Sequence, residues 1–563
     1  YQQNKQATMS AANSEISYDN NSGLKVEEVV KTTEDYFSDS SSVELENESP
    51  QSYNNPFLNT TFREKYTNIY EDAQYECRAR FDHLFRWTTT RQRKLTYKLD
   101  LRVTLLACFL FTALQMDRSN LSQAVSDNML KDLHLTTNDF NTGNTIFYVC
   151  FLAAELPSQL VSKRLGSDIW IPIQICAWSI VTICQFRLSG KASFFATRAL
   201  LGMCEGGFIA DMVLWLSYFY TSAELSIRLS FFWTAMYVTQ IANYLIAYGI
   251  LHMRGVLGHT GWEWLFLIEG LFTLLIGISA FFLMVPSPVQ TQRPWNPKGW
   301  FTEEEEKIIV NKVLRDDPTK GDMHNRQGLS LKMIWDALLD WHLWPMYLIG
   351  IVAYIPESTI SAYLTLLLRG MGFSTFHTNL LCIPYNVVKI IMLLGTTYIS
   401  EHVSNIFTVA LIQPFWGVIL VGVLRFWKGS LVNQWGTYVV LTLALGYPYI
   451  HAMMVSACSR NAQSIKTRTV ASSVYNMFVQ AGSIIASNVY RTQDKPLYHT
   501  GNSVLFALAL LMFPILIGTK FFYVNLNKRK AKVWDAMSED EQAHYIATTE
   551  DTGSSRLDFR FAH

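Results

Sequence analysis

The chain has 563 residues, of which 50% are hydrophobic and 16% are charged, and its mean hydropathy is positive. Soluble domains carry about 25% charged residues, so this composition argues against a string of soluble domains and predicts a polytopic, all-α membrane protein. The 46 basic and 46 acidic residues balance, so net charge gives no reason to expect a nucleic-acid partner. The eight cysteines include no C-x-x-C pair, so we expect neither a disulfide framework nor a metal site.

Polar residues dominate the first part of the chain. Residues 1–90 begin as an Asn-, Ser- and Glu-rich segment, and such a segment buries too little apolar surface to fold. We therefore predict a disordered cytoplasmic tail over 1–90. The first apolar run is preceded by a basic cluster, which marks the cytoplasmic side of the membrane. This cluster consists of Arg91, Arg93, Lys94 and Lys98.

Twelve apolar stretches of about 20 residues follow, and each is long enough to cross a bilayer. Their expected positions are 101–121, 139–161, 169–187, 193–215, 228–250, 263–285, 341–367, 376–398, 404–424, 435–457, 470–490 and 503–525. The connections are short except for one, which divides the spans into two sets of six. The sequence thus predicts a six-helix bundle over 91–285, a cytoplasmic linker over 286–340, a second six-helix bundle over 341–525 and a cytoplasmic tail over 526–563.

The linker contains one helix signal. Thr302 is followed by a run of glutamates, and the spacing of Thr302 and Glu305 is that of a capping box that begins an amphipathic helix. Acidic residues in the first turn favour the helix dipole. We predict a short surface helix that straps the two halves together and has no chemistry of its own.

The first span carries Asp117, Arg118 and Asn120 near its far end. An Arg at the centre of a spanning helix costs roughly 2.5–3.5 kcal/mol on insertion scales, so such residues usually face a bundle interior or a cavity. A cation in that position indicates an anionic ligand. The alternative is a local Asp117–Arg118 ion pair at the interface, or a side chain that reaches outward to the headgroups.

The fourth span holds Arg198 and Glu205 seven residues apart, so both side chains share one helix face about 10 Å apart. Gly202 and Gly206 have the small-xxx-small spacing that lets a second helix approach closely. Burial and a nearby Arg act in opposite directions on a carboxylate, so such a residue can bind or release a proton according to what the Arg binds. The alternative is an Arg198–Glu205 ion pair that braces two helices.

Other polar residues in the spans are weaker candidates. Lys389 lies in the middle of the eighth span and is expected to face the cavity, with substrate contact and a structural role both open. Glu357 follows a proline and is placed beside a cavity. Tyr447 is a candidate lining residue, although packing between helices explains it nearly as well. Glu155 is interpreted as a gating or structural residue and Glu269 as a structural one.

Four stretches carry a resemblance to a known family. Residues 155–166, ELPSQLVSKRLG, look like the loop-2/3 motif of the major facilitator superfamily. More specific are GWEWLFLIEG at 261–270, RDDP at 315–318 and SNVYRTQDKPLY at 487–498, which together resemble the fungal allantoate-permease family of anion:cation symporters. The resemblance covers about residues 90–563 and implies the major facilitator fold. The loop at 315–327 looks closest to the branch that contains a yeast sulfonate permease.

The resemblance implies roles for the charged residues of the first and fourth spans. In that family and its relatives, an Arg of the first helix engages the anionic group of the substrate and a Glu of the fourth helix carries the coupled proton. In this chain these positions are Arg118 and Glu205. Asp117 is then a second protonatable site, and Arg198 is the expected partner of Glu205.

Three further residues, Asn120, Lys389 and Tyr447, complete the expected substrate-binding set. Two positions depart from the family pattern. Glu263 stands where many members have Arg, and Lys389 is not expected at its position, so it marks a particular substrate preference. The expected gating residues, all from the loop-2/3 motif, are Glu155, Lys163 and Arg164.

The expected function is proton-coupled import of a small organic anion across the plasma membrane by alternating access, with both termini cytoplasmic. Sulfonate is the leading substrate, followed by carboxylates, including vitamins, such as nicotinate, pantothenate or allantoate. The expected partners are the substrate and membrane lipid, with protons as the coupling ion, no cofactor and a monomeric chain. A nutrient-sensing receptor, a proton antiporter or exporter, and a vacuolar location are the alternatives. An enzyme is not expected, because no nucleophile–base constellation or nucleotide loop stands out.

Overall fold

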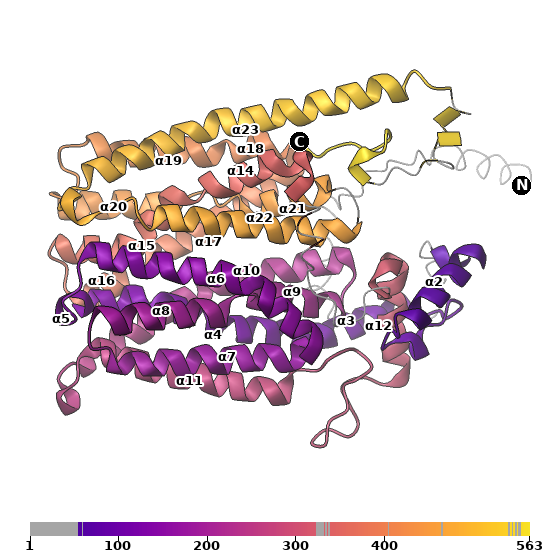
Figure 1. The fold of residues 1–563 in the computed structure, drawn as a ribbon, viewed down its shortest axis with the longest axis horizontal. Coiled ribbons are helices and arrows are strands. Elements are labelled where there is room, and N and C mark those ends of the chain that lie inside the picture. Colours follow the sequence, from indigo (N-terminus) through magenta and orange to yellow (C-terminus); the bar gives the residue numbers. More distant parts are fainter. Residues whose placement is uncertain are drawn as a thin grey trace, which may run out of the picture. The chain divides into compact units, whose positions relative to one another are not determined.

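The computed structural model describes residues 55–58, 60–321, 338–403, 405–462, 465–538 and 553–563, with isolated residues at 332, 335, 541–542, 544–545 and 549 (Figure 1). All of them belong to one compact unit, Asn47–His563. Over these residues the regular secondary structure is helical. The predicted all-α fold is confirmed.

Six spans form the N-terminal half. Their helices are α4 (Leu105–Ser126), α6 (Thr137–Leu165), α7 (Ser167–Cys184), α8 (Lys191–Glu205) with α9 (Phe208–Ser217), α10 (Ser222–Ile250) and α11 (Gly261–Leu283). On the linker side, α3 (Thr89–Leu99) and the π-helix η3 (Asp100–Thr104) lead directly into α4.

Six more spans form the C-terminal half. Their helices are α14 (Trp344–Val352) with α15 (Ile355–Gly370), α16 (Thr375–Leu381) with α17 (Ile383–Val403), α18 (Ile406–Ala410) with α19 (Ile412–Phe426), α20 (Gln434–Leu445) with α21 (His451–Asn461), α22 (Ile465–Ala486) and α23 (His499–Trp534). In the described part of the chain, nine helical segments are long and apolar enough to cross a membrane. The other three predicted spans correspond to α10, α20 with α21, and α22.

Several predicted bounds are wrong by a helical turn or more. α10 begins at Ser222 instead of 228, and α23 continues to Trp534 instead of ending at 525. The length of an apolar run reflects only the part of a helix that lies in the hydrocarbon core of the membrane. The helix itself continues into the polar headgroup zone until its backbone hydrogen bonds end at a cap. Thr221 caps α10 by accepting the backbone N–H of Glu224.

The fourth span is broken in the middle. α8 ends at Glu205, and Gly207 adopts a left-handed backbone with φ of 87° before α9 begins. The break frees carbonyl groups, which need donors inside a membrane protein. The Gln174 side chain donates to the carbonyl oxygen of Gly206 at 2.9 Å, and Gln159 donates to that of Gly207 at 3.2 Å. Glu205 is thereby fixed, buried, at the last residue of α8.

α8 packs closely on α6, as the spacing of Gly202 and Gly206 predicts. A Cβ at Gly202 would overlap the carbonyl oxygen of Phe147. A Cβ at Gly206 would lie 2.8 Å from the carbonyl oxygen of Phe151. The two glycines therefore let α8 lie close against α6, and this close packing fixes the position of Glu205 beside α6.

Hydrogen bonds join the two halves near the end of the bundle that carries α5 (Met129–Asp132) and α16 (Figure 1). The Asn141 side chain donates to the carbonyl oxygen of Tyr490 at 2.6 Å. The Tyr363 hydroxyl donates to the same carbonyl at 3.1 Å and also bonds the Asn141 side chain. We call these three residues the inter-half lock.

An N-terminal arm, residues 55–88, folds onto the linker helix α12 (Glu303–Asp316). It contains η1 (Pro56–Leu58), α2 (Thr60–Asp72) and η2 (Arg78–Arg80). The predicted disorder over 1–90 is wrong for this arm, because its aromatic residues find an apolar partner far along the chain. Residues 1–54 lie outside the described residues. The core that the arm shares with α12 consists of Phe57, Tyr70, Tyr75, Cys77, Val310 and Leu314.

The predicted capping box begins α12. Thr302 Oγ1 accepts the backbone N–H of Glu305, and the Glu305 carboxylate accepts that of Thr302 at 2.8 Å. Lys98 Nζ also donates to Glu305, at 2.7 Å. Among the described residues, the ion pairs that leave α12 run to the arm and to the N-terminal half, through Arg80, Arg91, Lys98 and Glu224. This corrects the predicted strap between the two halves.

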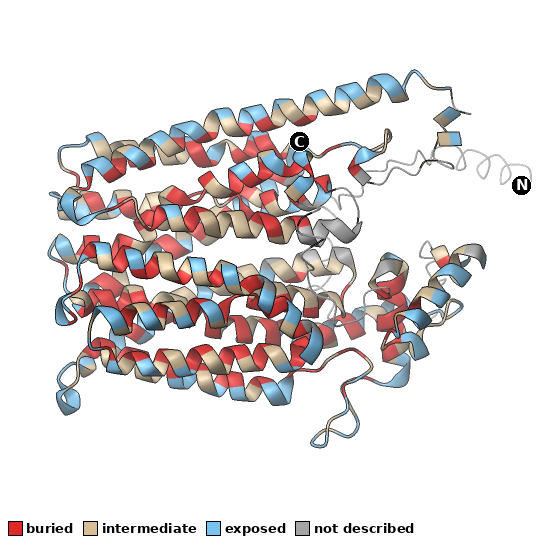
Figure 2. Cartoon of the chain, viewed as in Figure 1, coloured by how far each residue is buried: buried red, intermediate tan, exposed pale blue. Residues whose placement is uncertain are grey.

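Burial follows the faces of the helices (Figure 2). Buried residues line the sides that face other helices, and exposed residues lie along the outer side of α23 (Figure 2). Large apolar side chains are among these exposed residues, including Leu510, Leu511 and Phe521. Exposed apolar side chains along a helix of spanning length indicate contact with lipid.

Candidate functional site

A buried ion pair joins α4 to α8. Arg118 Nε donates to Glu205 Oε2 at 2.8 Å, and the guanidinium lies over the ring of Phe151 from α6, 5.0 Å from the ring centroid. The Glu205 side chain is 1% exposed, whereas that of Arg118 is 24% exposed. The cation is thus the accessible member of the pair. An anion that enters from solvent would meet Arg118 before it met Glu205.

Asp117 makes a separate set of contacts behind Arg118. The buried Asp117 carboxylate accepts hydrogen bonds from the Thr182 hydroxyl of α7 and from the Asn120 amide at 3.1 Å. The Asp117–Arg118 ion pair that the sequence left open is not among the ion pairs of the described residues. Asn120 is itself buried against Asp117. Its amide orients the Asp117 carboxylate, and the expected contact with substrate stays a prediction.

Arg198 is not the ion-pair partner of Glu205. Its Nη2 donates to the Asn144 side chain at 3.4 Å, and its guanidinium lies 4.4 Å from the centroid of the Phe147 ring. It still interacts electrostatically with Glu205 and Asp117. The expected Arg198–Glu205 ion pair is therefore not formed, because the Glu205 carboxylate accepts its hydrogen bond from Arg118 of another helix. Arg198 acts on Glu205 only through its charge.

The three expected gating residues have different positions. Glu155 is buried in α6 and interacts electrostatically with Arg118, so it belongs to the surroundings of the ion pair. Arg164 is exposed near the end of α6. The Lys163 side chain lies outside the described residues. The structure thus gives Glu155 a buried position and Arg164 an exposed one, although the motif groups them together.

The C-terminal half contains a second buried ion pair. Lys389 Nζ from α17 donates to Glu357 Oε1 from α15 at 2.7 Å. Three tyrosine rings surround the ammonium, with centroids at 5.3 Å for Tyr237, 5.0 Å for Tyr447 and 5.1 Å for Tyr449. Tyr237 belongs to α10 of the N-terminal half, so Lys389 lies at the seam between the halves.

Both ion pairs lie beside contacts between the halves. Arg118 lies one helical turn before Ser122, whose carbonyl oxygen accepts the Thr365 hydroxyl of the C-terminal half at 2.8 Å. Lys389 lies against the ring of Tyr237 from the N-terminal half. The two ion pairs therefore border the seam between the halves.

Sequence reasoning missed Tyr237 of this region, because it lies in an apolar helix with no distinguishing pattern. Glu269, which the sequence indicates is structural, stays untested in that role. It is buried, interacts electrostatically with Asp117, and has no hydrogen-bond partner for its carboxyl oxygens among the described residues. Only the fold brings residues 117 and 269 together.

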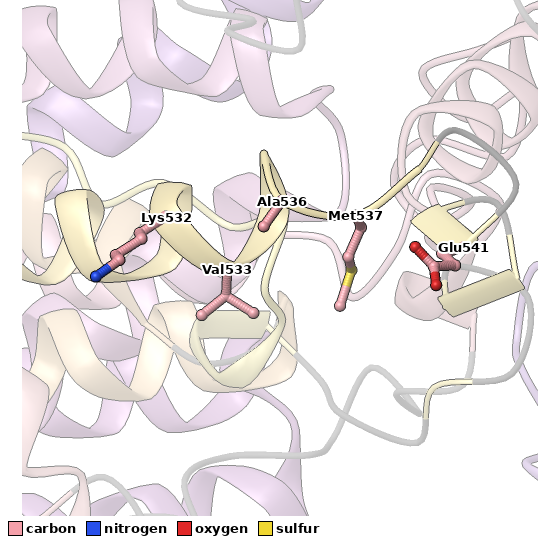
Figure 3. A pocket seen from close by; sticks show the side chains of 5 residues that line it. All are labelled: Lys532, Val533, Ala536, Met537 and Glu541. Atoms are coloured by element: carbon pink, nitrogen blue, oxygen red, sulfur yellow. The ribbon is translucent and has the colours of Figure 1, made fainter.

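Two of the hollows in the described part of the chain bear on where a ligand could bind. A cavity of about 40 Å³ inside the C-terminal half is lined by Glu357, Gln413 and Tyr447, among others, and it can hold a water molecule or two. A shallow groove lies at the end of α23, between Lys532 and Glu541, where the side chains do not converge on one point (Figure 3). Its two charged side chains, Lys532 and Glu541, lie at opposite ends of the groove (Figure 3). Within the described residues no cluster of His, Cys, Asp and Glu could hold a metal ion.

Two helical halves, buried charges at their seam and lipid-facing outer helices define a membrane transporter. A profile described as Major Facilitator Superfamily matches residues 107–487, and the chain belongs to this superfamily. The functional class is therefore a transporter rather than an enzyme, and such transporters bind small molecules within the membrane.

Individual relatives are similar over most of the chain. The "Uncharacterized transporter YIL166C" of Saccharomyces cerevisiae is 42% identical over 522 residues, which cover 92% of this chain and 96% of that one. The "MFS-type transporter efuF" of Hormonema carpetanum is 31% identical over 328 residues, 57% of this chain and 64% of that one. The E. coli xylose transporter XylE, solved in a partially occluded inward open conformation, shares the fold with a TM-score of 0.54 and 14% identity, over 73% of this chain and 97% of that one.

Proposed function

We propose that this protein is a proton-coupled importer of a small organic anion, with Arg118 as the group that binds the anion and Glu205 as the group that carries the proton. The observation that supports this proposal is the 2.8 Å ion pair between an accessible guanidinium and an enclosed carboxylate. A sulfonate is the leading substrate. A carboxylate such as nicotinate, pantothenate or allantoate is next, in keeping with the resemblance to the allantoate-permease family.

The mechanism follows from competition for one cation. An anion binds Arg118 only when Glu205 releases it, and a carboxylate that loses its cation in a buried site is stable only with a proton. Protonation of Glu205 from the outer side frees Arg118, the anion binds, and the two halves rock about the site. Release of the anion and the proton to the cytoplasm restores the ion pair.

Neighbouring groups adjust this exchange. Asp117 is a second protonatable group, and Asn120 and Thr182 hold its carboxylate in place. Arg198 keeps the region positive beside Glu205, and Lys389 with Tyr447 contributes the contacts of the C-terminal half. Glu155 competes with the substrate for Arg118, while Lys163 and Arg164 gate the cytoplasmic end.

We place the transporter in the plasma membrane as a monomer, with both termini and α12 in the cytoplasm and the inter-half lock at the extracellular end. Fluorescence of a tagged chain at the cell periphery, rather than on the vacuole, would support this location. Protease sensitivity of the N-terminal arm only in permeabilised cells would support the topology.

The decisive experiment is competition uptake at acidic pH with sulfonates, carboxylate vitamins and ureides. Arg118→Ala should lose concentrative uptake at unchanged membrane abundance, because alanine removes the guanidinium that binds the anion in this proposal. Arg102→Ala is the matched control, since Arg102 is exposed on the helix that leads into α4. Normal uptake by Arg118→Ala, or efflux against the gradient in the unmodified protein, would rule out the proposed mechanism.

A further inference from the structure

The two halves each hold a cation paired with a carboxylate. The pair Arg118–Glu205 at 2.8 Å lies in the N-terminal half, and Lys389–Glu357 at 2.7 Å lies in the C-terminal half. Arg118 lies one helical turn before Ser122, which bonds Thr365 of the C-terminal half. Lys389 lies against Tyr237 of the N-terminal half. Each half therefore presents one cation at the seam, where a bound molecule can contact both.

The surroundings of Lys389 contain hydrogen-bond donors that lack acceptors. The Tyr237 and Tyr447 side chains are buried, and neither hydroxyl has a hydrogen-bond partner among the described residues. Buried polar groups are normally satisfied, and each exception calls for an explanation. An ammonium with two free phenolic hydroxyls is a donor set that suits the several oxygens of a carboxylate or sulfonate.

A purely structural ion pair does not account for this arrangement. A brace between α15 and α17 requires only Lys389 and Glu357, yet Tyr237 reaches the ammonium from α10 of the other half. The cavity of about 40 Å³ beside Glu357 also gives water a place next to the carboxylate. A carboxylate with access to water can exchange a proton.

We propose, resting on the function proposed above, that the substrate carries two acidic groups, one bound by Arg118 and the other by Lys389 with the Tyr237 and Tyr447 hydroxyls. Each acidic group replaces a carboxylate, Glu205 at one end and Glu357 at the other. Each displaced carboxylate takes one proton. A dianion therefore enters with two protons, and the transported complex has no net charge.

The first test compares matched anions as competitors of uptake at acidic pH. Ethane-1,2-disulfonate is paired with ethanesulfonate, and succinate is paired with butyrate. In the unmodified protein the dianion of the preferred class should compete at least about tenfold better than its monoanion, as a charge-assisted hydrogen-bonded contact implies. Equal competition by the two members of each pair would overturn the inference.

The second test removes both charges of the Lys389 subsite together, so that neither is left buried without its partner. The double variant Lys389→Gln/Glu357→Gln should lower dianion uptake far more than monoanion uptake, so the preference falls by about tenfold or more. Tyr447→Phe removes a single hydroxyl and should lower the preference by a smaller factor. If the double variant does not reach the membrane, the preference for dianions can still be measured in Tyr447→Phe. A preference unchanged in both variants contradicts the proposal.

The third test counts protons in proteoliposomes that contain the full chain. The accumulation ratio of a dianion at static head should rise with the second power of the imposed proton gradient and should not respond to membrane potential. A first-power dependence for the dianion contradicts a role for Glu357. If monoanions accumulate with protons while dianions do not, this inference is wrong and the proposed function stands. If no anion accumulates with protons, the proposed function itself fails.

Discussion

In the proposed mechanism, the contact of Arg118 with Glu205 makes anion binding depend on a proton. The Glu205 carboxylate is enclosed, and breaking a buried ion pair by removal of one partner costs about 3–5 kcal/mol. Under this proposal an arriving anion cannot take Arg118 and leave a bare carboxylate behind. A proton on Glu205 removes this penalty, so the two ligands would bind together.

Glu205→Gln should abolish proton-driven accumulation while exchange of internal for external substrate continues. Glutamine keeps the shape of the side chain but cannot carry a proton, so the internal concentration should not exceed the external one. Uptake driven by a pH gradient and counterflow in preloaded vesicles measure the two activities separately. Glu304→Gln, at an exposed position of α12, is the control and should behave as the unmodified protein. Undiminished accumulation by Glu205→Gln would show that another group carries the proton.

At the scale of a helix, the position of α8 depends on glycines that leave no room for a side chain. Gly202→Ala should destabilise the protein by about 1–3 kcal/mol, because the new Cβ overlaps the Phe147 carbonyl and the helices must separate. Thermal unfolding of the detergent-solubilised protein measures the loss. Gly249→Ala makes the same substitution in α10, where a Cβ meets no atom within 4 Å. Equal melting of the two variants would argue against close packing of α8 on α6.

The contact between α12 and α3 should depend on pH. Burial alone would raise the pKa of Glu305, but hydrogen bonds from Lys98 and the Thr302 backbone outweigh it and hold this pKa below the usual value of 4.5. A carboxylate with a lowered folded-state pKa stabilises the folded form above the unfolded pKa. That stabilisation is lost as the pH falls through the folded value.

Glu305→Gln should therefore weaken the contact of α12 with α3 at neutral pH and remove its sensitivity to acid. Release of α12 can be followed by limited pepsin digestion between about pH 3 and pH 6, with the variant and the unmodified protein compared at each pH. The effect should be modest, since both partners are partly exposed. Glu64→Gln, on the exposed surface of α2, is the control. Equal cleavage of α12 in Glu305→Gln and in the unmodified protein at every pH would contradict this role of Glu305.

At the scale of the whole molecule, transport requires the halves to separate at one end and close at the other. The inter-half lock holds one end with a few polar bonds. Each such bond contributes about 0.5–1.5 kcal/mol, so the closed state is stabilised without being made permanent. Large apolar contacts alone would not open as readily.

Asn141→Ala should shift the population toward a conformation open at this end. Without its hydrogen bonds to Tyr490 and Tyr363, the closed state should be destabilised by about 1–2 kcal/mol. This free energy corresponds to a roughly five- to thirtyfold change in the ratio of the two states. A cysteine at Ser122, placed in a chain without the native cysteines, should then react several-fold faster with an impermeant thiol reagent. Thr142→Ala is the control, because its hydroxyl donates to the carbonyl oxygen of Asn138 in the same helix, its one hydrogen bond among the described residues. An unchanged labelling rate would show that the lock does not hold this end.

The sequence located Arg118, Glu205 and Lys389 because charges inside apolar runs are conspicuous and few. The partner that the sequence suggested for Glu205 was wrong. Spacing along one helix suggested Arg198 for Glu205, whereas the structure brings Arg118 from α4. A helix face restricts which residues can meet but not which neighbouring helix lies opposite. Tyr237 and Glu357 became partners of Lys389 only through the packing of α10 and α15 on α17.

Two things followed from the sequence alone: the number of spans with their division into halves, and the few residues whose charge requires a partner. Both depend on the cost of placing polar groups in hydrocarbon, which each segment meets independently of the others. The tertiary structure decided which charges pair, that the arm folds onto α12, and where the halves touch. These contacts join residues tens to hundreds of positions apart, and their energies depend on geometry that no local pattern records.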